Sequence, residues 1–118
     1  MADVYVFGSN LAGRHGAGSA LHARTYFGAQ YGNGIGRQGN SYAIPTKDHE
    51  LRVLPLHRIK KYVDDFLQYA IEHYYESFNV VEIGCGLAGY TPDQIAPLFR
   101  GHCGNVNLPE RFKVILDK

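Results

Sequence analysis

Short apolar runs separated by polar or glycine-rich stretches make up most of the chain, and one longer segment has apolar residues at helical spacing. In that segment apolar side chains recur every three or four positions, which predicts a helix with one buried face. The residues of this stripe are Ile59, Val63, Phe66, Leu67, Ala70, Ile71 and Tyr74. Short β-branched or aromatic runs bounded by turn residues predict strands. The predicted strands cover residues 4–7, 41–45, 80–83 and 113–116.

Two further segments are predicted to be helical. The first covers residues 19–27 and is stopped by the glycine that follows. In the second, Thr91 is followed by Pro92 and, three residues after the threonine, by Gln94. This pattern is a capping box with proline at the first helical position. We therefore expect a helix from Pro92 to about Arg100.

The alternation of strands and helices predicts the fold class. It indicates an α/β protein, a three-layer α/β/α sandwich around a mixed, largely parallel central sheet. Loops are expected over residues 28–40 and 46–55, which are rich in glycine and polar residues. The chain has 118 residues, which is room for a single domain, so residues 1–118 are predicted to form one unit without repeats or linkers.

Two glycine-rich loops, residues 8–18 and 84–89, each follow a predicted strand and lead into a helical pattern. Glycines at such junctions let backbone N–H groups approach a ligand, and the following helix adds a positive end. This arrangement favours a phosphate or diphosphate. One such loop is typical of a turn, whereas two indicate a clamp on a nucleotide-like ligand. The alternative is that the glycines serve only as tight turns.

The pattern Gly-x-Gly-x-x-Gly occurs twice, at residues 84–89 and 34–39. The copy at 34–39 follows a loop and precedes a strand, which predicts a flexible connection or turn. The copy at 84–89 lies in the last third of the chain, leaving no room for the βα units of a Rossmann domain. Because a P-loop lysine pattern is also missing from the sequence, nucleotide triphosphate hydrolysis has little support.

Charge and composition narrow the function further. The formal net charge is +1, which gives no electrostatic case for nucleic acid or a membrane as partner. The sequence has no apolar run of bilayer length and no leader pattern, so we expect a cytoplasmic protein in which Cys85 and Cys103 are reduced thiols. The six histidines are not at metal-ligand spacing, so we expect neither a metal nor another cofactor.

Several side chains in the two loops are candidates for ligand contact. Ser9 and Asn10 can bind a ribose hydroxyl, although both residue types also build turns. Arg14 and His15 flank the glycines and either reach an anion or lie in solvent. Cys85 can be a nucleophile at a helix N-terminus or a small residue that fills the loop, and the second role is favoured.

Lys47 and Asp93 are the catalytic candidates. Lys47 directly follows the segment Ser41–Thr46, which contains a predicted strand, and a desolvated lysine there can act as nucleophile or base. A solvated loop lysine is equally consistent with that position. Asp93 lies in the first turn of a capped helix, where the helix dipole favours an acid without any further role.

Taken together, residues 7–10, 14–24, 41–47 and 83–90 resemble segments of the macro domain, the α/β/α module that binds ADP-ribose. The segment 83–90 is the most specific. Its Ile-Gly-Cys-Gly-Leu run is similar to the branch of the family that contains the terminal ADP-ribose glycohydrolase of animals. The likeness extends over roughly residues 7–108, most of the chain.

The resemblance implies catalytic roles as well. In that branch a lysine just past the central strand attacks the distal ribose carbon, and Lys47 occupies the matching position. An aspartate after the leucine of the second loop completes the hydrolysis, but this chain has Ala88 there, and Asp93 follows about one helical turn later. The chain is also shorter than most macro domains and has no extra N-terminal strand, which suggests a minimal version of phage or bacterial type.

The function implied is binding of ADP-ribose or an ADP-ribosylated substrate through both loops, with hydrolysis of an ADP-ribosyl linkage as an additional activity. The alternative is a non-catalytic binding module for another nucleotide signal or a protein partner. The expected ligand-binding residues are Gly8, Ser9, Asn10, Gly13, His15, Gly16, Ala17, Gly18, Thr46, Gly84, Cys85, Gly86, Leu87, Ala88, Gly89 and Tyr90.

Overall fold

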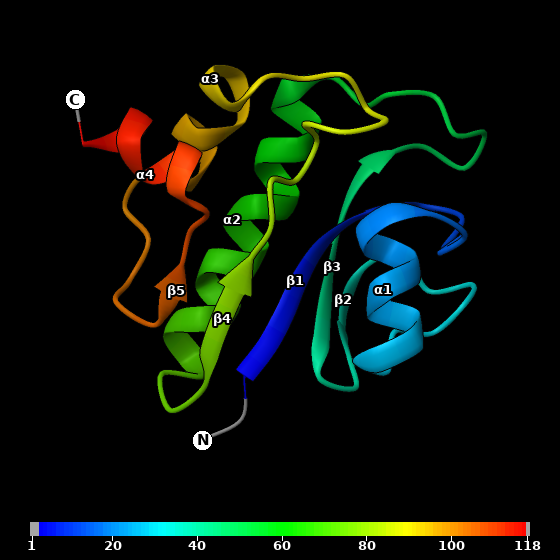
Figure 1. The fold of residues 1–118 in the computed structure, drawn as a ribbon, viewed down its shortest axis with the longest axis horizontal. Helices are drawn as coiled ribbons and strands as arrows, with labels where there is room; N and C mark the ends of the chain where they lie inside the picture. The colour runs from blue at the N-terminus through cyan, green and yellow to red at the C-terminus, as the bar shows by residue number, and fades with distance from the viewer. Residues whose placement is uncertain (1–2, 118) are drawn as a thin grey trace.

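A computed structural model of the protein describes residues 3–117. Its strands are β1 (Asp3–Asn10), β2 (Gly36–Gln38), β3 (Ser41–Lys47), β4 (Ser77–Val80) and β5 (Val106–Asn107). They form one sheet in the order β2-β3-β1-β4-β5 (Figure 1). β3, β1, β4 and β5 run parallel to one another, while β2 pairs antiparallel with β3. The predicted α/β class with a mixed, largely parallel sheet is therefore confirmed.

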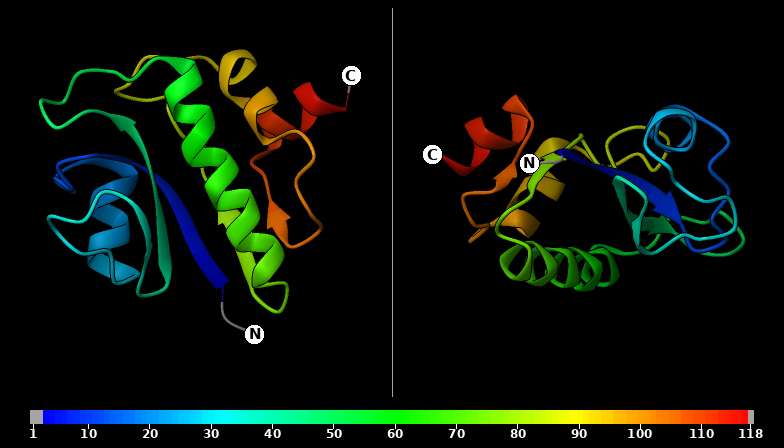
Figure 2. Two further views of the ribbon diagram at one scale, coloured as in Figure 1. Left: turned by 180° about the vertical axis from the view of Figure 1, so that it is seen from behind. Right: turned by 90° about the horizontal axis from the view of Figure 1, so that it is seen from below.

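Helices pack on both faces of this sheet. The helices are α1 (Gly18–Tyr26), α2 (Leu56–Glu72), α3 (Pro92–Ile95) and α4 (Glu110–Leu116), with a 3₁₀ segment η1 (Ala96–Phe99) directly after α3. The long helix α2 crosses one face, and α1 lies on the opposite face (Figure 2). α3, η1 and α4 pack together near β5.

The two faces have cores of different size. On the α2 side, the sheet, α2, η1 and α4 enclose a large cluster that includes Phe66, Phe78, Phe99 and Phe112, all fully buried. On the α1 side, the buried cluster is Phe7 together with four alanines, Ala20, Ala23, Ala29 and Ala43. Because alanine has the smallest apolar side chain, α1 packs close to β1, and Ala43 of β3 belongs to the same cluster.

Parallel strands bring three loops to one edge of the sheet. β1 and β3 end side by side, with Asn10 paired with Lys47, and β4 pairs with β1 up to Val80 opposite Val6. The segments that leave these strand ends therefore meet at the same edge, as parallel strands require. Figure 1 shows these loops gathered at the upper edge of the sheet.

The strand predicted over residues 113–116 is wrong, because these residues belong to helix α4. Four residues are too few for the apolar pattern alone to distinguish a strand from a helix. The residues around the start of the run determine that it is helical. Pro109 is the N-cap, Glu110 lies in the first turn and Phe112 is buried in the core. Ile115 and Leu116, three and four residues after Phe112, pack against the same core.

The strands predicted over residues 4–7 and 41–45 are confirmed as parts of β1 and β3, but one further strand was misplaced and two were missed. The strand predicted over residues 80–83 lies earlier, at Ser77–Val80, where Phe78 and Val80 alternate as buried residues. β2 and β5 were not predicted. β2 lies inside residues 34–39, which were expected to be a connection or turn, and Gly39 with a φ of +60° makes the turn into β3. β5 is two residues long, too short to give an alternating pattern.

The long predicted helix is confirmed, but its apolar stripe ends earlier than expected. Ile59, Val63, Phe66 and Ala70 are fully buried along one face of α2. The side chains of Ile71 and Tyr74 are 54% and 79% exposed. Tyr74 follows the helix, which ends at Glu72, so its spacing no longer follows a helical face.

The capping box is confirmed, since the Gln94 side chain accepts the Thr91 backbone N–H at 2.9 Å and the helix begins at Pro92. The helix is split, however. It changes after Ile95 into the 3₁₀ segment η1, which has Pro97 near its start. A proline ring within a helix removes a hydrogen bond and crowds the preceding turn, which accounts for the change.

An ion pair attaches the edge strand β2 to the turn between α2 and β4, and a further hydrogen bond of the same arginine reaches α2. The Arg37 guanidinium donates to both carboxylate oxygens of Glu76, at 2.8 and 2.9 Å, and to the Tyr69 hydroxyl at 3.0 Å. The Glu76 side chain is 11% exposed. These hydrogen bonds from Arg37 lower the pKa of the Glu76 carboxyl.

We predict that Glu76→Gln lowers the free energy of unfolding by about 1–3 kcal/mol near neutral pH, because a charge-assisted pair is lost. The pKa of Glu76 is lower in the folded state than in the unfolded state, so the pair stabilises above the usual glutamate pKa of about 4.3 and is lost as the pH falls through the lowered value. The difference between wild type and variant, measured by urea denaturation, therefore shrinks in acid. The control is Glu72→Gln, and a difference independent of pH would contradict the prediction.

Candidate functional site

A cavity of about 710 Å³ lies where the loops after β1, β3 and β4 meet. Its volume is in the range typical of small-ligand pockets. Three chain segments supply most of its wall: the end of β1 with the loop into α1, the end of β3, and residues 81–88. The lining residues are Gly8, Ser9, Asn10, Arg14, Gly16, Ala17, Gly18, Ser19, Ala20, Tyr31, Thr46, Lys47, Leu51, Val81, Glu82, Ile83, Gly84, Cys85, Gly86, Leu87 and Ala88.

Most of the residues that the sequence nominates come together in this cavity. Those that line it are Gly8, Ser9, Asn10, Gly16, Ala17, Gly18, Thr46, Lys47, Gly84, Cys85, Gly86, Leu87 and Ala88. Five nominated residues lie outside its lining, namely Gly13, His15, Gly89, Tyr90 and Asp93. Tyr31, Leu51 and Glu82 line the cavity but were not nominated.

The side chains of Ser9 and Asn10 hold the first loop in shape. The Asn10 amide nitrogen donates to the Arg14 carbonyl at 3.1 Å, and its oxygen accepts the Arg14 N–H at 2.9 Å. The buried Ser9 hydroxyl donates to the Gly34 carbonyl at 2.5 Å. Asn10 therefore acts as a turn-building group, the alternative that its residue type left open, whereas Ser9 ties the end of β1 to the segment before β2.

His15 holds the same loop in place from the protein interior. Its ring is fully buried, packs edge-on against Phe7 at 5.3 Å, and bonds through Nε2 to the Asn33 carbonyl at 2.9 Å. Because a carbonyl only accepts, Nε2 carries the proton, and Nδ1 is buried without a hydrogen-bond partner in the described part of the chain. His15 is thus neither solvated nor placed in the wall of the cavity.

The amino end of α1 opens into the cavity. Its N-cap, Ala17, has no side chain that can accept a hydrogen bond, and the first turn carries no acidic residue. Leu21 donates to the Ala17 carbonyl, whereas the N–H groups of Gly18, Ser19 and Ala20 precede the first intrahelical bond. These three residues line the cavity. The helix dipole and its free N–H groups therefore favour a negative group here.

The second glycine loop uses its glycines for two different purposes. Gly84 has a φ of +78°, and a Cβ added there would lie 3.0 Å from Ile95, so the loop needs glycine for its own packing. Gly86 has an ordinary φ, and a Cβ there would meet nothing within 4 Å. Since Gly86 lines the cavity, an added side chain at this position would occupy ligand space.

Tyr90 fastens the second loop to the segment after β3. Its hydroxyl donates to the Leu54 carbonyl at 2.6 Å, and its half-buried ring packs against the α2-side core. Tyr90 therefore supports the loop from outside the cavity wall.

Lys47 is the last residue of β3 and lines the cavity. Its carbonyl accepts the Leu11 N–H at 2.9 Å, which fixes its backbone beside the first loop. Within residues 3–117 its ammonium group forms no ion pair and no hydrogen bond. A cation thus lies in the cavity with its charge available to a ligand.

The acidic residue expected to be catalytic, Asp93, does not lie in the cavity. Asp93 lines a separate depression of about 390 Å³, together with Pro92, Glu110 and Arg111, and is not brought into the cavity. Ala88 lines the cavity and supplies no acid. The carboxylate among the lining residues is Glu82, whose oxygens accept hydrogen bonds from Arg111, with Arg111 Nε at 2.8 Å.

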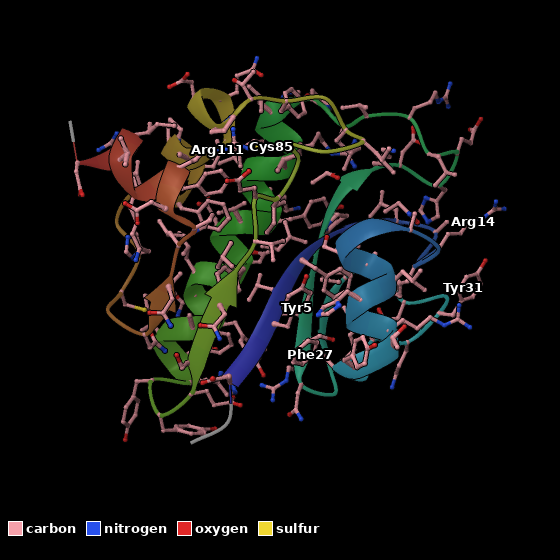
Figure 3. The ribbon with its side chains drawn as sticks, viewed as in Figure 1. Tyr5, Arg14, Phe27, Tyr31, Cys85 and Arg111 are labelled. Atoms are coloured by element: carbon pink, nitrogen blue, oxygen red, sulfur yellow. The ribbon has the colours of Figure 1, made fainter. Side chains whose placement is uncertain are left out.

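Cys85 lies next to this ion pair in the cavity wall, and Figure 3 shows Cys85 and Arg111 near each other. Burial, with the Glu82 charge adding to it, raises the pKa of the Cys85 thiol. A thiol with a raised pKa stays protonated at neutral pH and is a poor nucleophile. The chemistry of this position therefore favours the loop-filling role.

Within residues 3–117, no three or more His, Cys, Asp or Glu side chains gather in an arrangement that could hold a metal ion. In the same range, no helix is both long and apolar enough to cross a membrane.

Comparison with known proteins gives no relatives: no family model, curated protein or solved structure matches the chain.

We predict that Tyr90→Phe lowers the free energy of unfolding by about 0.5–1.5 kcal/mol, because the Leu54 carbonyl loses its donor while the ring packing is kept. Chemical denaturation measures this difference. Tyr74→Phe, which removes a hydroxyl from an exposed ring, is the matched control. Equal stability of Tyr90→Phe and wild type would contradict the assigned role.

Proposed function

We propose that the chain binds ADP-ribose, or an ADP-ribosyl group on a larger substrate, with the diphosphate between the loop at residues 13–18 and the loop at residues 84–89. The observation that carries this proposal is that the uncapped amino end of α1 and the unobstructed backbone at Gly86 line one cavity. Backbone N–H groups at both places can then donate to phosphate oxygens. The proposal includes a three-layer, macro-domain-like arrangement around the sheet.

The charges around the cavity favour an anionic ligand of moderate size. Arg14 and Lys47 are the cations in its wall, and the Glu82 carboxylate is already paired with Arg111. With a net charge of +1 for the whole chain, attraction is local to this site. This distribution fits a ligand with one diphosphate better than a long polyanion.

A second activity, hydrolysis of an ADP-ribosyl linkage, rests on Lys47. Its unpaired side chain in the cavity can act in two ways. As the neutral amine it can attack the ribose carbon, so that the leaving group departs with a proton and water then breaks the lysine–ribose bond. As the ammonium it can stabilise charge that develops at the ribose while water displaces the leaving group directly. Non-catalytic binding of another nucleotide signal or of a protein partner is the competing function, and the same binding experiments distinguish it.

We predict that Gly86→Leu weakens ADP-ribose binding at least tenfold, or about 1.4 kcal/mol, because the leucine side chain fills ligand space without straining the backbone. Isothermal titration measures the change. Gly104→Leu is the matched control, since a Cβ at Gly104 also meets open space and Gly104 is outside the cavity lining. Unchanged affinity of Gly86→Leu would reject the two-loop site, and a flat isotherm from folded wild type would reject ADP-ribose as the ligand.

We predict that Lys47→Ala keeps ADP-ribose affinity within a few-fold of wild type but lowers the rate of de-ADP-ribosylation by about a hundredfold or more, because the group acting on the ribose carbon is lost. The rate is followed as release of ADP-ribose from a modified substrate. Lys60→Ala, a surface lysine paired with Asp64, is the control. Full turnover by Lys47→Ala would remove this lysine from the mechanism, and no turnover by wild type would leave binding as the function.

A further inference from the structure

One aromatic side chain lies in the cavity wall without a role in the phosphate site. Tyr31, in the loop between α1 and β2, is the single aromatic among the described residues that line the cavity. Its side chain is 60% exposed, although most large apolar side chains of the sheet are buried. Figure 3 shows Tyr31 and Arg14 on the same side of the molecule, beyond α1.

The Tyr31 ring is held in place on one side. The guanidinium carbon of Arg24 lies 5.0 Å from the ring centroid, a cation–π contact that occupies one face of the ring. The ring is 60% exposed in spite of this contact, so it retains surface that a ligand can cover. A ring with a guanidinium on one face can stack a second planar group on its other face.

The backbone on each side of Tyr31 is held by a hydrogen bond, on one side to β2 and on the other to the first glycine loop. The Gln30 N–H donates to the Gln38 side-chain oxygen at 2.7 Å, and the Gly32 N–H donates to the Gly13 carbonyl at 2.9 Å. Tyr31 therefore belongs to the same rigid unit as the loop that leads into α1. A ligand that places a phosphate at α1 meets a preorganised ring nearby, so little conformational entropy is lost on contact.

The rim of the cavity has the apolar surface that a base needs. Besides Tyr31, Leu51 and Leu87 line the cavity and are 42% and 80% exposed. A diphosphate or a sugar hydroxyl gains nothing from such groups, whereas a nucleobase gains from stacking and from apolar contact.

We infer that Tyr31 is the base-stacking residue of the site, so that the cavity selects ligands with an aromatic base attached to the phosphate over sugar phosphates without one. This inference rests on the proposed function and adds to it the position of the base, on the α1 side of the cavity beside Arg14. The other end of the ligand then extends from the phosphates toward Lys47.

The absence of tryptophan from the sequence gives a direct test. Tyr31→Trp introduces a single indole whose fluorescence reports on stacking. Titration with ADP-ribose or AMP is expected to change this fluorescence, whereas ribose 5-phosphate is not. Tyr26→Trp is the control, because Tyr26 is 70% exposed but lies outside the cavity lining.

Affinity measurements complete the test. Tyr31→Ala is expected to weaken ADP-ribose binding roughly tenfold to a hundredfold, the effect of losing one base–aromatic stack, while Tyr31→Phe stays near wild type and ribose 5-phosphate binding is unchanged. If wild type binds ADP-ribose and Tyr31→Ala binds it equally well, the stacking role is overturned and the proposed function stands. If folded wild type binds none of the three ligands, both are overturned.

Discussion

The close packing of the first glycine loop against the turn at residues 32–34 is the constraint on which the site depends. A Cβ at Gly13 would lie 2.3 Å from the Asn33 nitrogen, and one at Gly34 would lie 2.0 Å from the Asn10 carbonyl oxygen. Neither contact is sterically allowed, so both positions require glycine. This packing fixes the path of the chain into α1, and with it the direction in which the amino end of that helix points.

Glycines such as Gly13, in the predicted phosphate loop, and Gly34, in the predicted turn, are therefore needed for packing between two backbone segments. The side chains around them serve the same purpose, since Asn10 closes the turn and His15 fills the space beneath it. The glycines with open space, such as Gly16 and Gly86, are the ones at which the backbone is accessible from the cavity. A glycine pattern alone does not distinguish these two uses, because a glycine needed for packing and a glycine that leaves the backbone accessible are the same residue in the sequence.

The sequence predicted the α/β class with its mixed sheet, the long helix and the capping box, since each depends on patterns among residues close together in the chain. It did not predict β5 or helix α4. β5 has only two residues and α4 contains only a short apolar run, so the secondary structure of both depends on tertiary contacts. For the site, position after a strand was enough to nominate Lys47. Glu82 and Tyr31 were missed because their placement in the wall follows from loop geometry, to which spacing along the chain is insensitive.

The unequal cores on the two faces of the sheet affect how the molecule fluctuates. The α2 side is closed by four buried phenylalanines, while the α1 side is closed by Phe7 and small alanine contacts. Apolar burial sets the cost of separating an element from the sheet, so α1 separates from the sheet at a lower free energy than α2. Transient opening is thereby concentrated beside the cavity, and a ligand held between the loops adds its binding energy to the less stable half of the domain.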